Sequence, residues 1–263
     1  MLIVDTHSHL IPAIDDGAKN MDETLEMCQI AEKENISKII ATPHFIRGEF
    51  FSTPRDVKDN VKNINKKLRE LGIDVKIYSG HEVFIDPDIP KLLINGEINT
   101  LNDSRYVLIE LPMNGIPSYT EDTLYSIRLK GYVPVIAHPE RNSEIINDPN
   151  ILFRLIELGA VSQMTTFSLL GKYGERIQKV SEEMLRHNLV HLMATDAHTP
   201  RRRSPKIVEA QKRLVDMVGA QKANTIMANG ERILQNQELE IFIPHKIEKL
   251  SVFSKMMKKL RIG

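Results

Sequence analysis

The residues of this chain that could do chemistry begin at its N-terminus. Asp5-Thr-His-Ser-His9 directly follows the apolar run Leu2-Ile3-Val4, a pattern typical of a short buried strand. Because side chains alternate along a strand, His7 and His9 should point to the same face. Two imidazoles on one face can hold a divalent ion, but such a pair could equally form hydrogen bonds inside a core.

The rest of the sequence favours the metal site, because His, Asp or Glu residues follow six of seven predicted strands. The candidate ligands are His7, His9, Asp16, His44, Glu82, Glu110, His138, Asp196 and His198. So many polar groups would be costly to bury together without metal ions. Four ligands serve one ion, so two or three ions are implied, and His with carboxylate suits Mn²⁺, Fe²⁺ or Zn²⁺. We expect the other histidines to be structural or solvent-facing: His81, His187, His191 and His245.

The segments that must position these ligands alternate between strand and helix patterns. Strands are predicted at 2–4, 38–41, 75–79, 106–109, 133–136, 160–164 and 190–194. Helices are predicted from about 20, and at 54–71, 87–94, 119–130, 149–158, 171–187, 205–218 and 220–227. This order predicts an α/β fold, a distorted (β/α)7 TIM-like barrel whose strand C-termini meet at one mouth. A doubly wound open sheet is the alternative, but it would more often carry a glycine-rich phosphate loop, which we do not find.

Composition indicates an ordinary globular protein and separates a basic tail from the rest of the chain. The 263 residues are 41% hydrophobic and 27% charged with zero formal net charge, which is ordinary for a soluble protein and suggests no nucleic-acid partner. The sequence has no 18-residue apolar run and no signal-peptide pattern, so we expect a cytoplasmic protein. We expect a barrel domain at 1–244. The basic tail at 245–263 could form an amphipathic helix that lies on an anionic membrane or docks on the barrel.

Several motifs resemble those of the polymerase-and-histidinol-phosphatase (PHP) superfamily, and within it the bacterial manganese-dependent protein-tyrosine phosphatases of capsule and exopolysaccharide operons. The motifs are Asp5-Thr-His-Ser-His9, Asp15-Asp16-Gly17, Thr42-Pro43-His44, Gly80-His-Glu82, Leu101-Asn-Asp-Ser-Arg-Tyr106, Leu108-Ile-Glu110, Ala137-His-Pro-Glu-Arg141 and Thr195-Asp-Ala-His198. They extend over residues 5–198, nearly the whole predicted barrel.

The resemblance implies a ligand set and a substrate. His7, His9, Glu82 and Asp196 would hold a first ion. Glu82 would bridge to a second ion that Glu110 and His138 also hold, and Asp16, His44 and His198 would hold a third. The activity would be hydrolysis of phosphotyrosine with Mn²⁺, and the partner an autophosphorylating bacterial tyrosine kinase of polysaccharide synthesis. A small-molecule phosphatase of the histidinol-phosphate type, a phosphodiesterase, and a non-enzymatic metal-binding scaffold remain as alternatives.

Arginines near the predicted mouth could bind the phosphate. Arg141, three residues after His138, is the candidate catalytic residue, because a guanidinium can take two phosphate oxygens at once. Arg47 and the run Arg201-Arg202-Arg203 are weaker candidates that could receive a phosphate or an acidic peptide, with Arg203 the first of the run to test. The single cysteine, Cys28, lies in a predicted helix without a phosphate loop, so a thiolate nucleophile is not expected.

Overall fold

The computed structural model describes residues 3–248. Its strands are β1 (Ile3–Ser8), β2 (Ile36–Ala41), β3 (His44–Phe45), β4 (Lys76–Ser79), β5 (Glu82–Phe84), β6 (Tyr106–Glu110), β7 (Val133–Ala137), β8 (Val161–Thr165) and β9 (Leu192–Ala194). The helices are α1 (Met21–Lys33), α2 (Pro54–Leu71), α3 (Ile89–Asn95), α4 (Thr120–Leu129), α5 (Ser143–Asn147), α6 (Asn150–Glu157), α7 (Thr166–Leu169), α8 (Glu175–Arg186), α9 (Val208–Val218) and α10 (Ala220–Leu234). Two 3₁₀ turns are η1 (Leu101–Asp103) and η2 (Pro139–Arg141).

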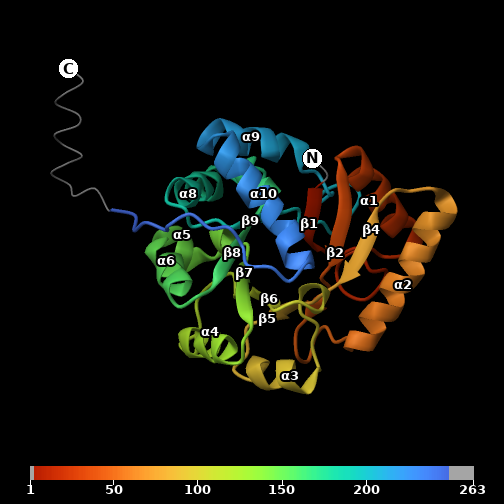
Figure 1. The fold of residues 1–263 in the computed structure, drawn as a ribbon, viewed down its shortest axis with the longest axis horizontal. Helices are drawn as coiled ribbons and strands as arrows, with labels where there is room; N and C mark the ends of the chain where they lie inside the picture. Colours follow the sequence, from red (N-terminus) through yellow and green to blue (C-terminus); the bar gives the residue numbers. More distant parts are fainter. Residues whose placement is uncertain (1–2, 249–263) are drawn as a thin grey trace.

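All paired strands are parallel, and the helices surround them (Figure 1). One sheet has the order β1-β2-β4 and the other β3-β5-β6-β7-β8-β9. The first and last strands also meet: Asp196 N donates to His7 O at 2.9 Å, His9 N donates to Ala197 O at 2.7 Å, and Ser8 forms a parallel bridge with Ala197. The α/β class with parallel strands is confirmed, and these contacts are the ones through which a seven-unit barrel would close.

The structure has nine strands among its described residues rather than the seven expected, because two strands are interrupted and continue. β2 ends at Ala41 and β3 begins at His44, since Pro43 has no N–H to donate to a ladder. β4 and β5 are separated by Gly80 and His81. A Cβ on Gly80 would lie 3.0 Å from Ile40, so the chain bends where only glycine fits without displacing its neighbour. Both interruptions deliver a predicted ligand at the start of the continuing strand.

Alternate residues of the strands contribute to two hydrophobic clusters. In β6, Val107 and Ile109 pack toward the surrounding helices, whereas Leu108 belongs to a smaller central cluster. That smaller cluster contains Ile40, Leu101, Tyr106, Leu108, Val135, Ala137, Val161, Leu192 and Ile233. Ile233 comes from α10, which lies against β1 so closely that a Cβ on Gly230 would be 3.0 Å from Val4. The apolar interior therefore leaves the polar ends of the strands as the place for a site.

Several predicted helix ends were wrong for identifiable reasons. α8 begins at Glu175 rather than 171, because Gly171 and Gly174 both have positive φ. α9 begins at Val208 rather than 205. The Glu34 carboxylate accepts hydrogen bonds from Ile207 N and Val208 N at this start. The helix predicted at 220–227 continues as α10 to Leu234. The helix predicted at 54–71 is confirmed as α2, and Thr53 and Gly72 flank it with a capping box and a left-handed C-cap.

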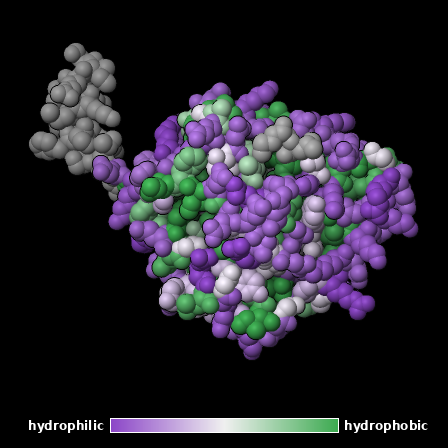
Figure 2. All heavy atoms as spheres, in the orientation of Figure 1, coloured by the Kyte–Doolittle hydropathy of each residue, from purple (hydrophilic) through white to green (hydrophobic). Residues whose placement is uncertain are grey.

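The tail is described only at its beginning. His245 N donates to His187 O, and the main chain of Ile247 exchanges two hydrogen bonds with the Asn150 side chain. The expected amphipathic helix falls mainly on 249–263, outside the described residues. In the part of the chain that is described, no helix has the length and apolarity needed to cross a membrane. Figure 2 shows one face as mainly hydrophilic with separate hydrophobic patches.

Candidate metal centre

Four of the predicted ligands come from β1, the residue just after it, β5 and the loop after β9, and they meet around one point. His7 Nε2 and His9 Nε2 are 3.1 Å apart. Glu82 Oε2 lies 3.2 Å from His7 Nε2 and 3.1 Å from His9 Nε2. Asp196 Oδ1 lies 3.3 and 3.5 Å from the same two nitrogens. This is the set that the resemblance assigns to a first ion, and all four side chains are buried.

A second group shares Glu82. His138 Nε2 lies 2.9 Å from Glu82 Oε1 and 3.8 Å from Glu110 Oε1, in the arrangement expected for a bridging carboxylate. His44 Nδ1 is also close, at 3.1 Å from Glu82 Oε2 and 3.6 Å from Glu110 Oε2. Glu82, Glu110 and His44 form one of the groups whose ligand atoms could hold an ion. The structure thus places His44 beside the second group as well as the third.

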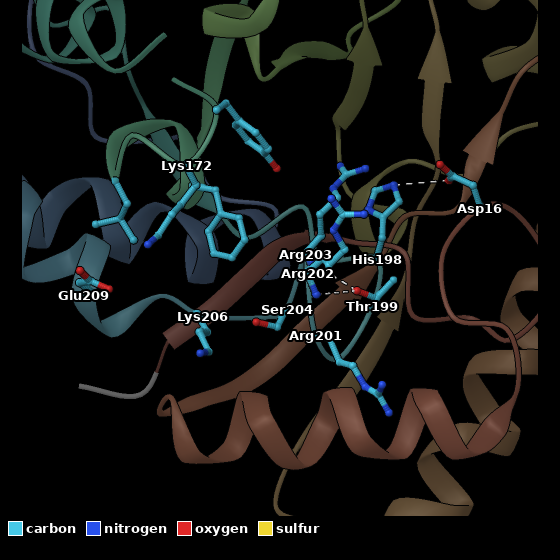
Figure 3. Close-up of a pocket in the computed structure, with 13 residues that line it drawn as sticks. Asp16, Lys172, His198, Thr199, Arg201, Arg202, Arg203, Ser204, Lys206 and Glu209 are labelled. Carbon is cyan, nitrogen blue, oxygen red and sulfur yellow. Dashed lines mark hydrogen bonds and ion pairs between the residues drawn. The ribbon is translucent and has the colours of Figure 1, made fainter. Parts of the chain in front are cut away.

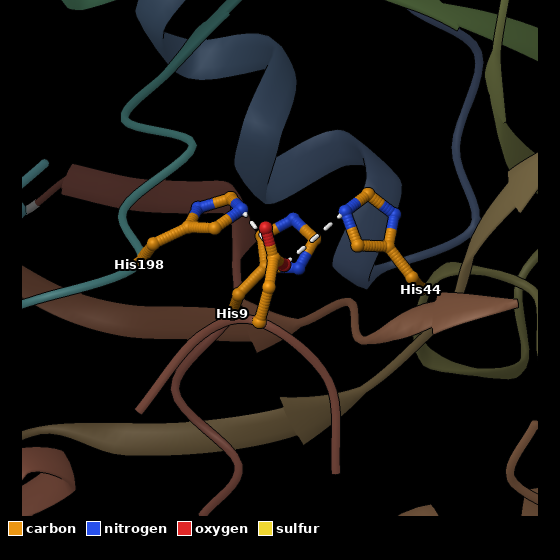
Figure 4. Close-up of side chains that lie close together, drawn as sticks. His9, His44 and His198 are labelled. Atoms are coloured by element: carbon orange, nitrogen blue, oxygen red, sulfur yellow. Dashed lines mark ion pairs between the residues drawn. The ribbon is translucent and has the colours of Figure 1, made fainter. Parts of the chain in front are cut away.

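The third group lies over the first-strand loop. His9, His44 and His198 converge (Figure 4), with Asp16 Oδ1 3.5 Å from His44 Nε2 and 3.4 Å from His198 Nε2. Asp16 reaches them because the following Gly17 passes directly against His9: a Cβ on Gly17 would lie 2.0 Å from His9 O. The Asp-Asp-Gly motif therefore needs its glycine for close approach of two chain segments.

Partners on the far side of the imidazoles orient them. His9 Nδ1 lies 2.8 Å from Asp15 Oδ2, and His7 Nδ1 lies 2.7 Å from Gln163 Oε1. These contacts turn both Nε2 atoms toward the cluster, as outer partners do for metal-binding histidines. Neither role was predicted from the sequence. Asp15 belongs to the Asp15-Asp16-Gly17 motif and could have been found there. Gln163 lies inside β8, outside every motif, so the sequence gives no signal for its role.

Buried charges perturb the pKa values of the cluster. Burial and the nearby Glu82 carboxylate raise the pKa of Glu110 to about 8. Burial lowers the pKa of His44 to about 4. Although burial alone would lower it, the pKa of His9 is raised well above its usual value, chiefly by Asp15. Burial alone would raise the pKa of Asp196, but His7, His9, Arg203 and His138 together hold it well below the usual range. Such mutually shifted groups are characteristic of functional sites.

The backbone at two candidate ligands is strained, and buried hydrogen bonds hold the loop before one of them, Asp196. His138 has a φ of 32° and Asp196 a φ of 52°, values that residues other than glycine rarely adopt. The buried Asp5 carboxylate accepts hydrogen bonds from Thr195 N and Thr195 Oγ1, which ties the loop before Asp196 to β1. Burial raises the pKa of Asp5 to about 6. Asp5 is thus a further residue of the site region to which the sequence motifs assigned no role.

Two of the five candidate arginines, Arg141 and Arg203, lie beside the cluster. Arg141 Nη1 is 2.6 Å and Arg203 Nη2 is 2.5 Å from the same atom, Asp196 Oδ2. The Arg141 guanidinium also lies 5.2 Å from the centre of the Tyr173 ring, a contact that sequence reasoning did not anticipate. Arg47 is instead paired with Asp88 at 2.8 Å and Asp86 at 3.6 Å, and no pair joins it to the cluster within residues 3–248.

Two of the remaining histidines, His81 and His191, have structural contacts. His81 Nδ1 accepts from Asn99 N and His81 Nε2 lies 3.1 Å from Ser52 Oγ, so this ring joins two loops. His191 Nδ1 accepts from Ser162 N and lies just before β9 rather than inside a strand. Burial lowers the pKa of both rings to about 4.

One atom tests whether these residues fit metal ions. Glu82 Oε2 is buried without a hydrogen-bond donor, yet three imidazole nitrogens, from His7, His9 and His44, lie 3.1–3.2 Å away. A buried carboxylate oxygen facing several histidines fits a site in which it and they share cations. The donor set of nitrogen and oxygen without sulfur suits Mn²⁺, Fe²⁺ or Zn²⁺.

Comparison with known proteins agrees with this geometry. Residues 3–235 match the sequence model of the family described as "Capsular polysaccharide synthesis, CpsB/CapC". The chain belongs to the CpsB/CapC family. Tyrosine-protein phosphatase YwqE of Bacillus subtilis is 36% identical over 251 residues, covering 95% of this chain and 99% of YwqE. Tyrosine-protein phosphatase CpsB of Streptococcus pneumoniae is 29% identical over 241 residues, covering 89% of this chain and 99% of CpsB.

A solved CpsB/CapC structure has the same fold. It comes from work on YwqE from Bacillus subtilis and CpsB from Streptococcus pneumoniae, described as "unique metal-dependent tyrosine phosphatases". The TM-score is 0.91 at 36% sequence identity, with 94% of this chain and 100% of the other covered. The resemblance stated from the motifs is therefore confirmed at the level of the family.

Proposed function

We propose that this chain is a metal-dependent protein-tyrosine phosphatase that regulates capsular or exopolysaccharide synthesis. The observation that carries the proposal is Glu82 Oε2, buried among three imidazole nitrogens at the polar end of the strands. Membership of the CpsB/CapC family and the names of its phosphatase relatives support the reaction class. The mouth of the site is flanked by two arginines, as a phosphate substrate requires.

The ligand assignment follows the three groups. His7, His9, Glu82 and Asp196 would hold one ion, and Glu82, Glu110 and His138 a second. Asp16, His44 and His198 would hold a third, and the Asp16 side chain in this group is half exposed. Bound ions would supply Lewis-acid stabilisation of the phosphoryl group and lower the pKa of a water molecule.

The chain's own groups bind and orient the substrate. Arg141 and Arg203 each donate to Asp196 and retain further N–H groups that can take phosphate oxygens. Asp196 in turn holds both guanidinium groups at the edge of the cluster. Asp15 and Gln163 keep the ring nitrogens of His9 and His7 directed inward, so the ligands are preorganised before any ion binds.

The finer parts of the proposal are the metal, the partner and the location. We propose Mn²⁺ as the metal, with iron or zinc as alternatives, and an autophosphorylating bacterial tyrosine kinase as the phosphoprotein partner. We propose that the protein acts in the cytoplasm and that the basic tail at 245–263 forms a peripheral contact with an anionic membrane surface. The motif resemblance and the tail's composition support these proposals. Nucleic acid is not proposed as a partner.

A side-by-side assay tests the function. The purified protein should release phosphate from a tyrosine-phosphorylated peptide in preference to histidinol phosphate or a phosphodiester. Preference for histidinol phosphate would favour the small-molecule phosphatase, and preference for a diester the phosphodiesterase. A metal-loaded protein that releases no phosphate from any aryl phosphate would be a scaffold rather than an enzyme.

A further inference from the structure

A cavity of about 820 Å³ opens beside the candidate metal centre. Asp16 and His198 line both the cavity and the third ligand group, so the two are continuous. Its other walls come from the segment between α7 and α8 and from the loop that follows His198. In the view of Figure 3, His198 lies between Asp16 on one side and Lys172 and Lys206 on the other.

The cavity wall carries more positive than negative groups. Five cationic side chains line it, against the carboxylates of Asp16 and Glu209. The cations are Lys172, Arg201, Arg202, Arg203 and Lys206. Arg203 is paired with Asp196, but within residues 3–248 no ion pair joins the other four to a carboxylate. These four exposed cationic side chains are therefore available to an anionic ligand.

Apolar side chains accompany these cations. Phe167, Leu170 and Tyr173 line the same cavity. Glu140 Oε1 accepts from Thr165 N, which ties η2 to β8 just before α7, and the Arg141 guanidinium lies 5.2 Å from the centre of the Tyr173 ring. The wall next to the phosphate-binding arginines is thus part apolar and part cationic, a composition that suits a peptide better than a bare inorganic anion.

The size of the cavity can be compared with the length of a peptide substrate. An extended peptide advances about 3.3–3.6 Å per residue, so a cavity of this size takes about two or three residues beside the one being hydrolysed. A phosphotyrosine with its phosphate at the ligand cluster would have its neighbours at the cavity. Among the labelled cationic residues, Lys172 and Lys206 lie farthest from Asp16 in the view of Figure 3, so they would meet flanking residues rather than the phosphate.

We propose that this cavity binds acidic residues flanking the phosphotyrosine and so selects substrates by sequence. The inference rests on the proposed function, because it assigns the substrate class of the same site. Lys172, Arg202 and Lys206 would provide the selection through complementary charge, acting mainly on association and on discrimination between partners.

The test compares two phosphotyrosine peptides of equal length, one with Asp and Glu beside the phosphotyrosine and one with Ser and Gly there. The measured quantity is the ratio of kcat/KM for the acidic peptide to that for the neutral peptide. In the unaltered protein we expect a ratio of about ten or more, falling with added salt. Lys172→Glu/Lys206→Glu should lower the ratio about tenfold, and the corresponding Gln variant should lower it less.

A matched control reverses two exposed lysines elsewhere. Lys62→Glu/Lys130→Glu changes the net charge by the same amount on α2 and after α4, and should leave the ratio within about twofold. Metal content and melting temperature, measured on every sample, show whether the variants remain folded. A ratio near one in the unaltered protein, or equal falls in both double variants, would overturn the inference. Failure to hydrolyse either peptide would instead overturn the proposed function.

Discussion

Asp15→Asn should weaken metal binding without removing a ligand. The Asp15 carboxylate has three hydrogen-bonding partners: Oδ2 lies 2.8 Å from His9 Nδ1 and accepts from His44 N at 3.0 Å, and Oδ1 accepts from Gly17 N at 2.9 Å. An asparagine can keep the hydrogen bond from Gly17, but its NH₂ group cannot accept from His44 N. It also presents a donor, where the carboxylate was, to the protonated nitrogen of His9.

The expected cost follows from the role of the Asp15 carboxylate beside His9. Removing the outer partner of a metal-binding histidine typically weakens metal affinity about 10–100-fold, or about 1.4–2.7 kcal/mol. Burial alone would raise the pKa of Asp15, but the His9 imidazole and the backbone N–H groups of Gly17 and His44 together lower it. The carboxylate is therefore charged at neutral pH, and the substitution removes a full charge. The structure therefore predicts a large effect from a residue that is not among the nine candidate ligands.

The assay is a Mn²⁺ titration of metal-stripped protein, with the initial rate on a phosphotyrosine peptide measured along it. Asp15→Asn should shift the titration midpoint upward about 10–100-fold and recover much of the rate at saturating Mn²⁺, because the ligands themselves remain. Asp22→Asn, on the exposed side of α1, is the matched control and should leave the midpoint unchanged. A midpoint within about threefold of the unaltered protein would refute the reasoning.

Three further predictions concern Arg141, Cys28 and Glu110. Arg141→Lys should lower kcat/KM on a phosphotyrosine peptide about 10–100-fold with metal content unchanged, since lysine cannot donate from a planar fork; unaltered kinetics would remove Arg141 from substrate binding. Cys28→Ser should keep kcat within about threefold, because the Cys28 thiol is buried in the core with its pKa raised to about 12; a thousandfold loss would indicate a thiolate mechanism. Mn²⁺ uptake at about pH 7 should release protons, because the pKa of Glu110 is raised to about 8 and metal binding needs the charged carboxylate. The affinity for Mn²⁺ should therefore increase from about pH 6 to about pH 8. Calorimetric binding enthalpies that do not vary with the buffer would contradict this prediction.

The sequence predicted the candidate ligands because each follows an apolar strand segment. Parallel strands bring their C-terminal ends together, so residues as distant as His7 and Asp196 could be assigned to one cluster before the structure was known. The resemblance placed His44 with Asp16, but the additional contact of His44 with Glu82 was not predicted, since it depends on the bend at Pro43 that starts β3. Local patterns fix which strand end carries a ligand but not the direction in which a bent strand continues.

Contacts between distant segments were the main omissions. Gln163 has the sequence character of an ordinary strand residue, and only the pairing of β8 with its neighbours places it beside His7. Lys172 belongs to a loop without any motif, and its position at the cavity comes from the turn between α7 and α8. The wrong start of α9 has a similar origin, because its capping carboxylate, Glu34, is supplied by the end of α1.

Removing and returning the metal is the most direct test of the central claim. The protein is exhaustively treated with a chelator, its metal content is measured, and phosphotyrosine hydrolysis is followed before and after Mn²⁺ is restored. We predict that the stripped protein loses its activity and that Mn²⁺ returns it together with two or three bound ions per chain. Full activity in protein shown to be free of metal would contradict the proposal that His7, His9, Glu82 and their neighbours form a catalytic metal centre.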